Sequence, residues 1–288
     1  MIYYQCVFKF KLRLSSVKIN RLYADLGLLA TAVVWGATFP VIKIALNYIS
    51  PFAFNSIRFF LASLLFIPFL KREGWKEGIK IGFCTFLGYS FQTVGMKFTT
   101  ATNAGFITSL YVVLAPILAY LLYRARLRLL DVLCLIIALI GFYLLSGYEG
   151  FRFGDILIFL CAIGFGMEIA MISYHSKNVN PTILAFWQIL AVAIFSTPLA
   201  LITTDKLTFN FDVIYALVVT VFLATFVAKM FQNWFQRYVS VTEASLILSL
   251  EGVFAHVFAV FMLGETLSVV QYFGALLITV AVILTSLR

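Results

Sequence analysis

The stretch FQNWFQRYVSVTEASLILSLEG, residues 231–252, repeats an earlier stretch of the same chain, FQTVGMKFTTATNAGFITSLYV at residues 91–112. Eight of the twenty residues in 101–120 are identical to the residue 140 positions later. A second offset of 130 positions relates the parts of the chain before these stretches, and it matches Asp25 with Asp155. Because the matches keep their order and use only two offsets, the sequence predicts two copies of one structural unit.

The composition is typical of a membrane protein, since 63% of the 288 residues are apolar and only 11% are charged. Seven uncharged runs could form membrane-spanning helices: 26–42, 81–96, 98–123, 132–148, 178–204, 213–228 and 266–287. Three further apolar segments carry one charge each: 51–70 with Arg58, 154–174 with Glu168, and 242–263 with Glu251. In lipid the backbone must satisfy its own hydrogen bonds, which favours helices. We therefore predict an all-α polytopic membrane protein with ten transmembrane helices.

Each copy of the repeated unit holds five of these helices. An odd number of crossings means that the second copy enters the membrane from the opposite side, so the two repeats are inverted. This architecture is typical of secondary transporters, which bind their solute near the middle of the membrane where the repeats meet. We predict a basic cytoplasmic tail at residues 1–24, a first five-helix repeat at 25–148 and a second at 149–288.

The net charge of +9 is explained by membrane topology rather than by a nucleic-acid partner. With the N-terminus inside, 15 basic residues lie in cytoplasmic segments and three lie outside, namely Lys97, Arg152 and Lys206. This positive-inside bias predicts a multi-pass protein of the cell (inner) membrane with both termini in the cytoplasm. The four cysteines show no metal or disulfide spacing, and no cofactor is predicted.

Five motifs occur in order along the chain: WGATFPVIKIAL (35–46), the segment from Pro51 to Arg58, TTATNAGFITSLYVVLAP (99–116), QNWFQRYVSVTEASLILSLEGVFA (232–255) and LGETLSVVQYFGALLI (263–278). From about residue 25 to the end, the chain resembles the EamA-type transporters of the drug/metabolite transporter superfamily. The resemblance implies ten helices in two five-helix repeats and transport of small organic solutes, often efflux of amino acids or related metabolites. The chain departs from the family at Gly252, usually proline, at Ala125, often acidic, and at His256, usually small. These departures bear on the substrate rather than on the fold.

Ionisable side chains inside the predicted helices are candidates for the solute site, because each costs about 2.5–3.5 kcal/mol at the bilayer centre. Glu168 and Glu251 would supply negative charge, and Arg58 and Lys229 positive charge. Each also has a structural alternative. The glutamates could cap or pair inside the bundle, and the basic side chains could extend to the membrane surface.

Uncharged candidates accompany these charges. Thr38 lies at the repeat position of Glu168, and hydrogen bonds could come from Gln92, Asn103 and Gln232, with aromatic walls from Trp35, Tyr111 and Trp234. His256 ends a polar stripe with Ser245, Ser249 and Gly252, whose spacing places all four on one helix face. The stripe could equally serve close helix packing, and the aromatic residues could be ordinary packing.

No phosphate-binding loop is present, which excludes ATP-driven pumping by this chain alone. From the inverted repeats, the mixed charges and the family resemblance, we interpret the sequence as a secondary, non-ATP transporter that exports small polar metabolites such as amino acids by alternating access. The cavity is expected between the first, third, fourth, sixth, eighth and ninth helices. Efflux of drug-like or other organic solutes is the alternative, and an intramembrane enzyme or a receptor is the rival class. An enzyme would need a nucleophile–base pair or a metal cluster. Proton coupling and passive exchange both stay open, as do transport direction and assembly as a monomer or dimer in the bilayer.

Overall fold

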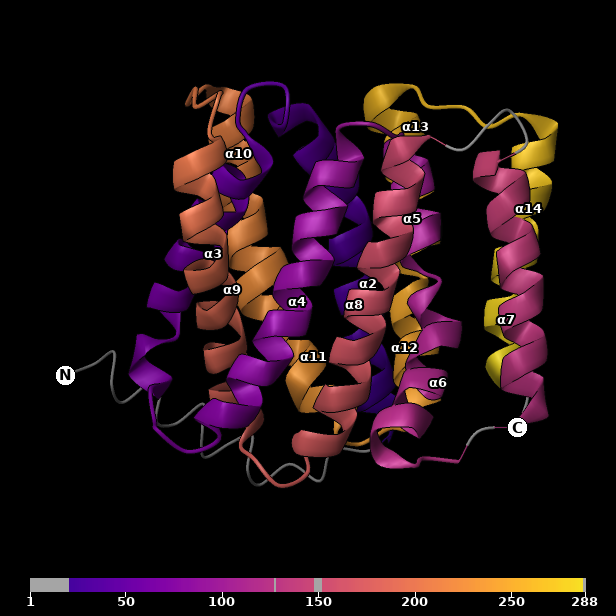
Figure 1. Cartoon of the computed structure of the whole chain (residues 1–288), viewed down its shortest axis with the longest axis horizontal. Helices are drawn as coiled ribbons and strands as arrows, with labels where there is room; N and C mark the ends of the chain where they lie inside the picture. Colours follow the sequence, from indigo (N-terminus) through magenta and orange to yellow (C-terminus); the bar gives the residue numbers. More distant parts are fainter. Residues whose placement is uncertain (1–20, 127, 148–151, 287–288) are drawn as a thin grey trace.

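The computed structural model describes residues 21–126, 128–147 and 152–286. Within these ranges the chain forms ten helical segments, several of them broken, and no β-strand longer than the isolated bridge between Ile49 and Leu207 (Figure 1). The prediction of an all-α protein with ten helices in two repeats is confirmed. Most of the predicted basic tail, residues 1–20, and the last two residues lie outside the described ranges.

The first repeat contributes α2 (Arg21–Ala45), α3 (Pro51–Leu65), the short η1 (Ile67–Phe69), α4 (Trp75–Met96), α5 (Ala101–Thr108), α6 (Tyr111–Tyr123), α7 (Leu129–Phe142) and the π-helix η2 (Tyr143–Gly147). The second contributes α8 (Phe153–His175), α9 (Pro181–Thr203), α10 (Phe211–Val219), the π-helix η3 (Thr220–Val227), α11 (Ala228–Gln236), α12 (Val241–Ser249), α13 (Glu251–Leu263) and α14 (Val269–Ser286). Six of the described helical segments are long and apolar enough to span a membrane: 21–45, 101–123, 153–175, 181–203, 211–236 and 241–263.

The repeat is visible in how the helices begin. Pro51 starts α3 and Pro181 starts α9, each at the first turn, where a missing N–H costs nothing. Thr100 caps α5 by accepting a hydrogen bond from the backbone N–H of Asn103, and Ser240 caps α12 in the same way. The same local chemistry therefore sets the same helix starts in both halves.

Two helices are broken at equivalent positions. The break between α5 and α6 lies at Ser109 and Leu110, and the break between α12 and α13 lies at Leu250, the repeat mate of Leu110. The two breaks touch, because the Ser109 hydroxyl donates a hydrogen bond of 2.8 Å to the Ser249 carbonyl. A Cβ at Gly252 would lie 2.5 Å from the Ser109 oxygen, so a larger residue there would have to displace the side chain that joins the two breaks. Tyr111 and Glu251 thus begin the second halves of two crossed helices.

Helices α4 and α8 pack with their backbones in near contact through glycines. A Cβ added at Gly164 would lie 2.8 Å from the backbone nitrogen of Gly88 and 3.1 Å from the carbonyl oxygen of Cys84. Close packing of small residues stabilises helix pairs in membranes, where lipid is as apolar as the side chains.

We expect Gly164→Val to separate these helices and to lower the free energy of unfolding by about 1–3 kcal/mol, since overpacked contacts cannot relax against backbone. Thermal unfolding in detergent measures the change. Leu160→Val on the partly exposed face of the same helix is the control and should unfold close to the wild-type temperature. An unchanged unfolding temperature for Gly164→Val would contradict the close approach of α8 to the α4 backbone at Gly88.

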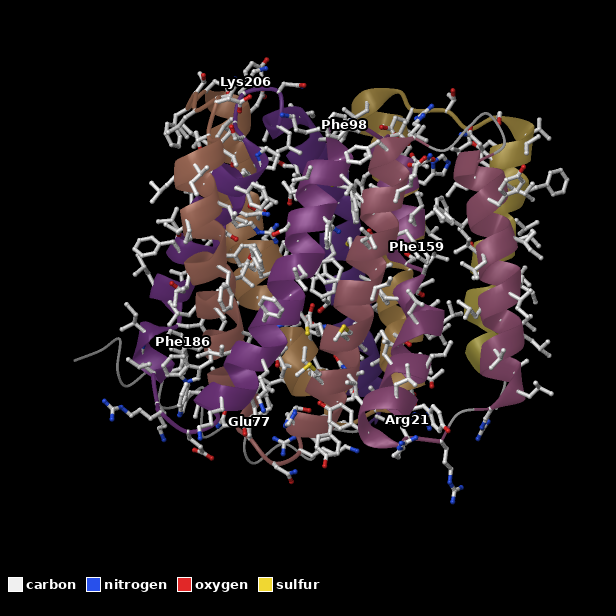
Figure 2. The ribbon with its side chains drawn as sticks, viewed as in Figure 1. Arg21, Glu77, Phe98, Phe159, Phe186 and Lys206 are labelled. Atoms are coloured by element: carbon white, nitrogen blue, oxygen red, sulfur yellow. The ribbon has the colours of Figure 1, made fainter. Side chains whose placement is uncertain are left out.

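The two ends of the bundle are distinct in Figure 2. Arg21 and Glu77 lie at one end, called here the Arg21 end, and Lys206 and Phe98 lie at the opposite end, called the Lys206 end. At the Lys206 end, the Ser50 N–H donates to the Lys206 carbonyl at 2.9 Å, and the Ser50 hydroxyl donates to Asp205 at 2.5 Å. That side-chain bond lowers the pKa of Asp205 below its ordinary value. These bonds join a loop of the first repeat to a loop of the second.

Further contacts tie the helices together at the Lys206 end. The Lys43 ammonium donates to the carbonyls of Met96 (2.6 Å) and Thr99 (2.5 Å). The Glu265 carboxylate accepts two hydrogen bonds of 2.8 Å from the backbone N–H groups of Ala101 and Thr102, at the start of α5. The Lys206 end is therefore held by hydrogen bonds between segments far apart in the sequence.

Candidate functional site

A cavity of about 450 Å³ lies where the two repeats meet. Only about 30 Å³ of it can hold the centre of a water molecule, which is room for about two waters. Nine predicted site residues line it: Trp35, Thr38, Arg58, Gln92, Tyr111, Glu168, Lys229, Gln232 and Glu251. The lining also includes six residues that the sequence analysis did not single out: Phe39, Ile42, Tyr89, Met96, Phe165 and Ile169.

A buried ion pair stands at one wall of this cavity. The Lys229 ammonium, on α11, lies 2.6 Å from a carboxylate oxygen of Glu168, on α8, and the two side chains are only 2% and 1% exposed. Lys229 also donates to the side-chain carbonyl of Gln232 at 3.1 Å. The alternative that Lys229 extends to the membrane surface is therefore wrong. Its charge is held at the cavity by Glu168.

Amide side chains hold the Glu168 carboxylate from the other side. The Gln188 amide, on α9, donates 2.7 Å to the same oxygen of Glu168 and also lies 2.9 Å from the Thr85 hydroxyl. Asn233 in turn donates 3.0 Å to the Gln188 carbonyl oxygen. The roles of Thr85, Gln188 and Asn233 were not predicted from the sequence. The sequence does mark two of these residues. Gln188 is the repeat mate of the charged Arg58, and Asn233 follows Gln232 in a polar stretch.

Three aromatic rings surround the Lys229 ammonium. The nitrogen lies 4.6 Å from the ring centre of Trp35, 5.4 Å from that of Tyr89 and 5.5 Å from that of Phe165. Rings at these distances attract a cation through their negatively polarised faces. The wall around the Glu168–Lys229 pair is thus adapted to hold positive charge.

The π-helix η3 shapes the neighbouring wall. The Trp35 indole N–H donates 2.9 Å to the carbonyl of Ala224, and Arg58 donates 2.8 Å to the hydroxyl of Thr225, both within η3. Short π-helical segments recur at functional sites because they change which backbone groups are available to neighbours. Irregular backbone of one repeat therefore positions two side chains of the other.

Arg58 is a buried cation that has no carboxylate within 4 Å in the part of the chain that the structure describes. Its side chain is almost fully buried, and its guanidinium carbon lies 4.9 Å from the ring centres of both Phe59 and Tyr89. The alternative of reaching the membrane surface is wrong for this side chain as well. Its charge is offset by a hydroxyl and two rings.

Glu251 is the other buried carboxylate of the cavity, and no basic group lies within 4 Å of it in residues 21–126, 128–147 and 152–286. It lies near the Tyr111 hydroxyl, its repeat mate. The two groups miss hydrogen-bond geometry, and the Tyr111 hydroxyl oxygen has no hydrogen-bond partner among the described residues. The cavity therefore contains one ion pair together with one cation and one carboxylate that are not paired.

Three predicted site residues lie outside the cavity lining: Asn103, Trp234 and His256. The Trp234 indole donates 2.7 Å to the hydroxyl of Thr182, and a ring nitrogen of His256 lies 3.3 Å from the hydroxyl of Thr102. The backbone of Asn103 is part of the α5 cap. The polar stripe that ends in His256 serves the crossing of the broken helices, as Ser249 and Gly252 show. Among the described residues, no group of three or more His, Cys, Asp or Glu side chains could hold a metal ion.

Comparisons with known proteins agree with this architecture. The EamA-like transporter family matches the chain twice, over residues 22–147 and 152–287. An uncharacterized transporter of Archaeoglobus fulgidus is 59% identical over 270 residues, which cover 94% of this chain and 88% of that protein. The uncharacterized transporter YoaV of Bacillus subtilis is 20% identical over 271 residues, covering 88% of this chain and 93% of its own.

A solved protein structure has a TM-score of 0.71 and 18% sequence identity, and the match covers 93% of this chain and 98% of that one. This likeness shows the fold. The twofold family match, the apolar helices and the highly similar archaeal transporter together confirm the resemblance that the motifs predicted. The protein is a multi-pass membrane protein, and it belongs to the EamA-like transporter family.

Proposed function

We propose that the protein is a secondary carrier, rather than an enzyme, that exports small polar solutes such as amino acids by alternating access. The observation that carries this proposal is the charge pattern of the central cavity. Arg58 and Glu251 face one enclosed space without an ion-pair partner in the described part of the chain. A zwitterionic solute could offset both charges at once, with its carboxylate toward Arg58 and its ammonium toward Glu251.

The shape of the cavity supports alternating access. Room for about two waters cannot admit an amino acid, so the cavity must widen for a solute to enter. At the Lys206 end, the bonds of Ser50 to Asp205 and Lys206 join the two repeats. Loading from that end would require these bonds to break, which is the kind of rearrangement that inverted repeats make in secondary transporters.

A second candidate, efflux of drug-like organic solutes, is favoured by the aromatic walls of the same cavity. Trp35, Tyr89, Tyr111 and Phe165 all line it. Rings of this kind can hold an apolar body or an organic cation without a carboxylate. The two candidates differ in whether the solute must carry a carboxylate for Arg58.

Exchange across liposomes tests both candidates. The purified protein is placed in liposomes loaded with a mixture of the common amino acids or of organic cations, and entry of each labelled compound is followed. We expect exchange of at least one zwitterion, and its loss in Arg58→Gln, with Arg72→Gln as the control in an exposed loop. Exchange of organic cations alone, unaffected by Arg58→Gln, would favour the drug-like candidate and rule out the first.

We also propose that the protein lies in the cell membrane, as a monomer, with both termini in the cytoplasm. The support is that 15 basic residues fall on one side of the predicted topology and three on the other. A reporter fused after Arg288 should therefore be active in the cytoplasm, and one inserted beside Asp205 should be active outside. A C-terminal reporter active outside would contradict this orientation.

A further inference from the structure

A second cavity opens at the Arg21 end, between α6, α8 and the start of α12. About 320 Å³ of it can hold the centre of a water molecule, against about 30 Å³ in the central cavity. Its inner wall is formed by Ala119, Ala170 and Ser173, which are buried within the bundle. It is therefore a recess between helices rather than a dent in the surface.

The recess continues the helix faces that line the central cavity. On α6, Tyr111 lines the central cavity and Ala119 lines the recess. Ala115 lies on the same helix face, between these two residues. On α8, Phe165 and Ile169 line the central cavity, and Ser173, the next residue on the same face, lines the recess. Ala115 and Ile169 are buried, so side chains of the bundle core separate the two spaces.

The recess has the chemistry of a site for an anionic group beside an apolar body. Lys177 lines it, is exposed, and has no carboxylate within 4 Å among the described residues. Asn178 adds hydrogen-bonding groups, and the Ser173 hydroxyl accepts a hydrogen bond of 2.7 Å from the Gln236 amide, which leaves its O–H to donate. Tyr123 and Tyr174 stack with ring centres 4.0 Å apart and an angle of 11° between their planes, which gives a flat apolar wall.

We infer that this recess is a second solute site, in which Lys177 binds the carboxylate of a solute that passes to or from the central cavity. The passage of solute between the recess and the central cavity rests on the proposed function. The binding of an anionic group by Lys177 depends only on the residues of the recess. An anionic lipid headgroup also carries negative charge. The deep wall at Ala119 and Ala170 favours a small solute, because a headgroup stays at the membrane surface.

Thiol modification in liposomes tests the site without measuring transport. The parent carries Cys6→Ala and keeps the three buried cysteines Cys84, Cys134 and Cys161. Ala119→Cys is added to this parent and treated with an anionic or a cationic methanethiosulfonate reagent, with and without Lys177→Gln. Leu70→Cys, an exposed position at the same end of the bundle, is the matched control.

We expect both reagents to modify Ala119→Cys and the anionic reagent to be preferred. That preference should fall by about fivefold when Lys177→Gln removes the local positive charge, with no change at Leu70→Cys. A thiol inert to both reagents, or an unchanged preference, would overturn the inference.

The rates are also compared in vesicles of phosphatidylcholine with and without phosphatidylglycerol, normalised to Leu70→Cys. Protection of Ala119→Cys by phosphatidylglycerol would assign the recess to lipid and overturn the solute site, and equal normalised rates would support it. Failure of the liposome exchange assay would leave these outcomes unchanged, so the two proposals can fail separately.

Discussion

Replacing Lys229 with methionine should lower the free energy of unfolding by about 3–5 kcal/mol and abolish transport. The substitution leaves the Glu168 carboxylate buried without its cation, and breaking a buried ion pair from one side has a cost of this size. The hydrogen bond from Gln188 remains but cannot neutralise the charge. Thermal or denaturant unfolding in detergent measures the stability, and exchange in liposomes measures the transport.

The double variant Glu168→Gln with Lys229→Met separates a lost charge pair from lost packing. Removing both charges should restore most of the stability, because neither member of the pair is then left buried without its partner. Lys76→Met, at the start of α4, is the matched control, because this lysine lies over the Trp75 ring at the edge of the bundle and should change stability little. If Lys229→Met were as stable as the wild type, the Glu168–Lys229 pair would not hold the cavity together.

Replacing Glu251 with glutamine should leave the protein folded and reduce exchange by about 10- to 100-fold. The side chain keeps its shape, and no basic group within 4 Å among the described residues loses a partner. A hydrogen bond from a solute ammonium to a carboxylate contributes about 1.5–3 kcal/mol, and the loss of that interaction sets the expected reduction. If protons are coupled through this carboxylate, the pH dependence of uptake should disappear as well.

Glu73→Gln, in an exposed loop, is the control for this experiment and should transport normally. Expression and unfolding temperature confirm that Glu251→Gln is folded. Normal exchange by Glu251→Gln with an unchanged pH dependence would make Glu251 structural. The coupling role would then pass to Glu168, the other carboxylate of the cavity.

The sequence by itself was sufficient for the architecture. Hydropathy and charge are properties of short segments, and a helix in lipid must satisfy its own backbone, so ten helices could be counted from the chain alone. The repeated stretch at 91–112 and 231–252 predicted the two repeats. The breaks at Leu110 and Leu250 then lie at equivalent positions, because equivalent sequences meet equivalent surroundings. Nine of the twelve predicted site residues line the cavity. The sequence could predict them because polar groups at membrane depth avoid lipid and face the interior of the bundle.

Only the tertiary structure decided which of these groups are paired. In the sequence, Glu168 and Glu251 are alike, each a single carboxylate in an apolar helix, but packing brings Lys229 to Glu168 and leaves Glu251 beside a tyrosine. Packing also turns Trp234 and His256 to Thr182 and Thr102, outside the cavity. Pairing depends on the distance between side chains of different helices. That distance is set by how glycines and broken helices let the backbones approach. It therefore depends on residues far apart in the sequence, which no local pattern brings together.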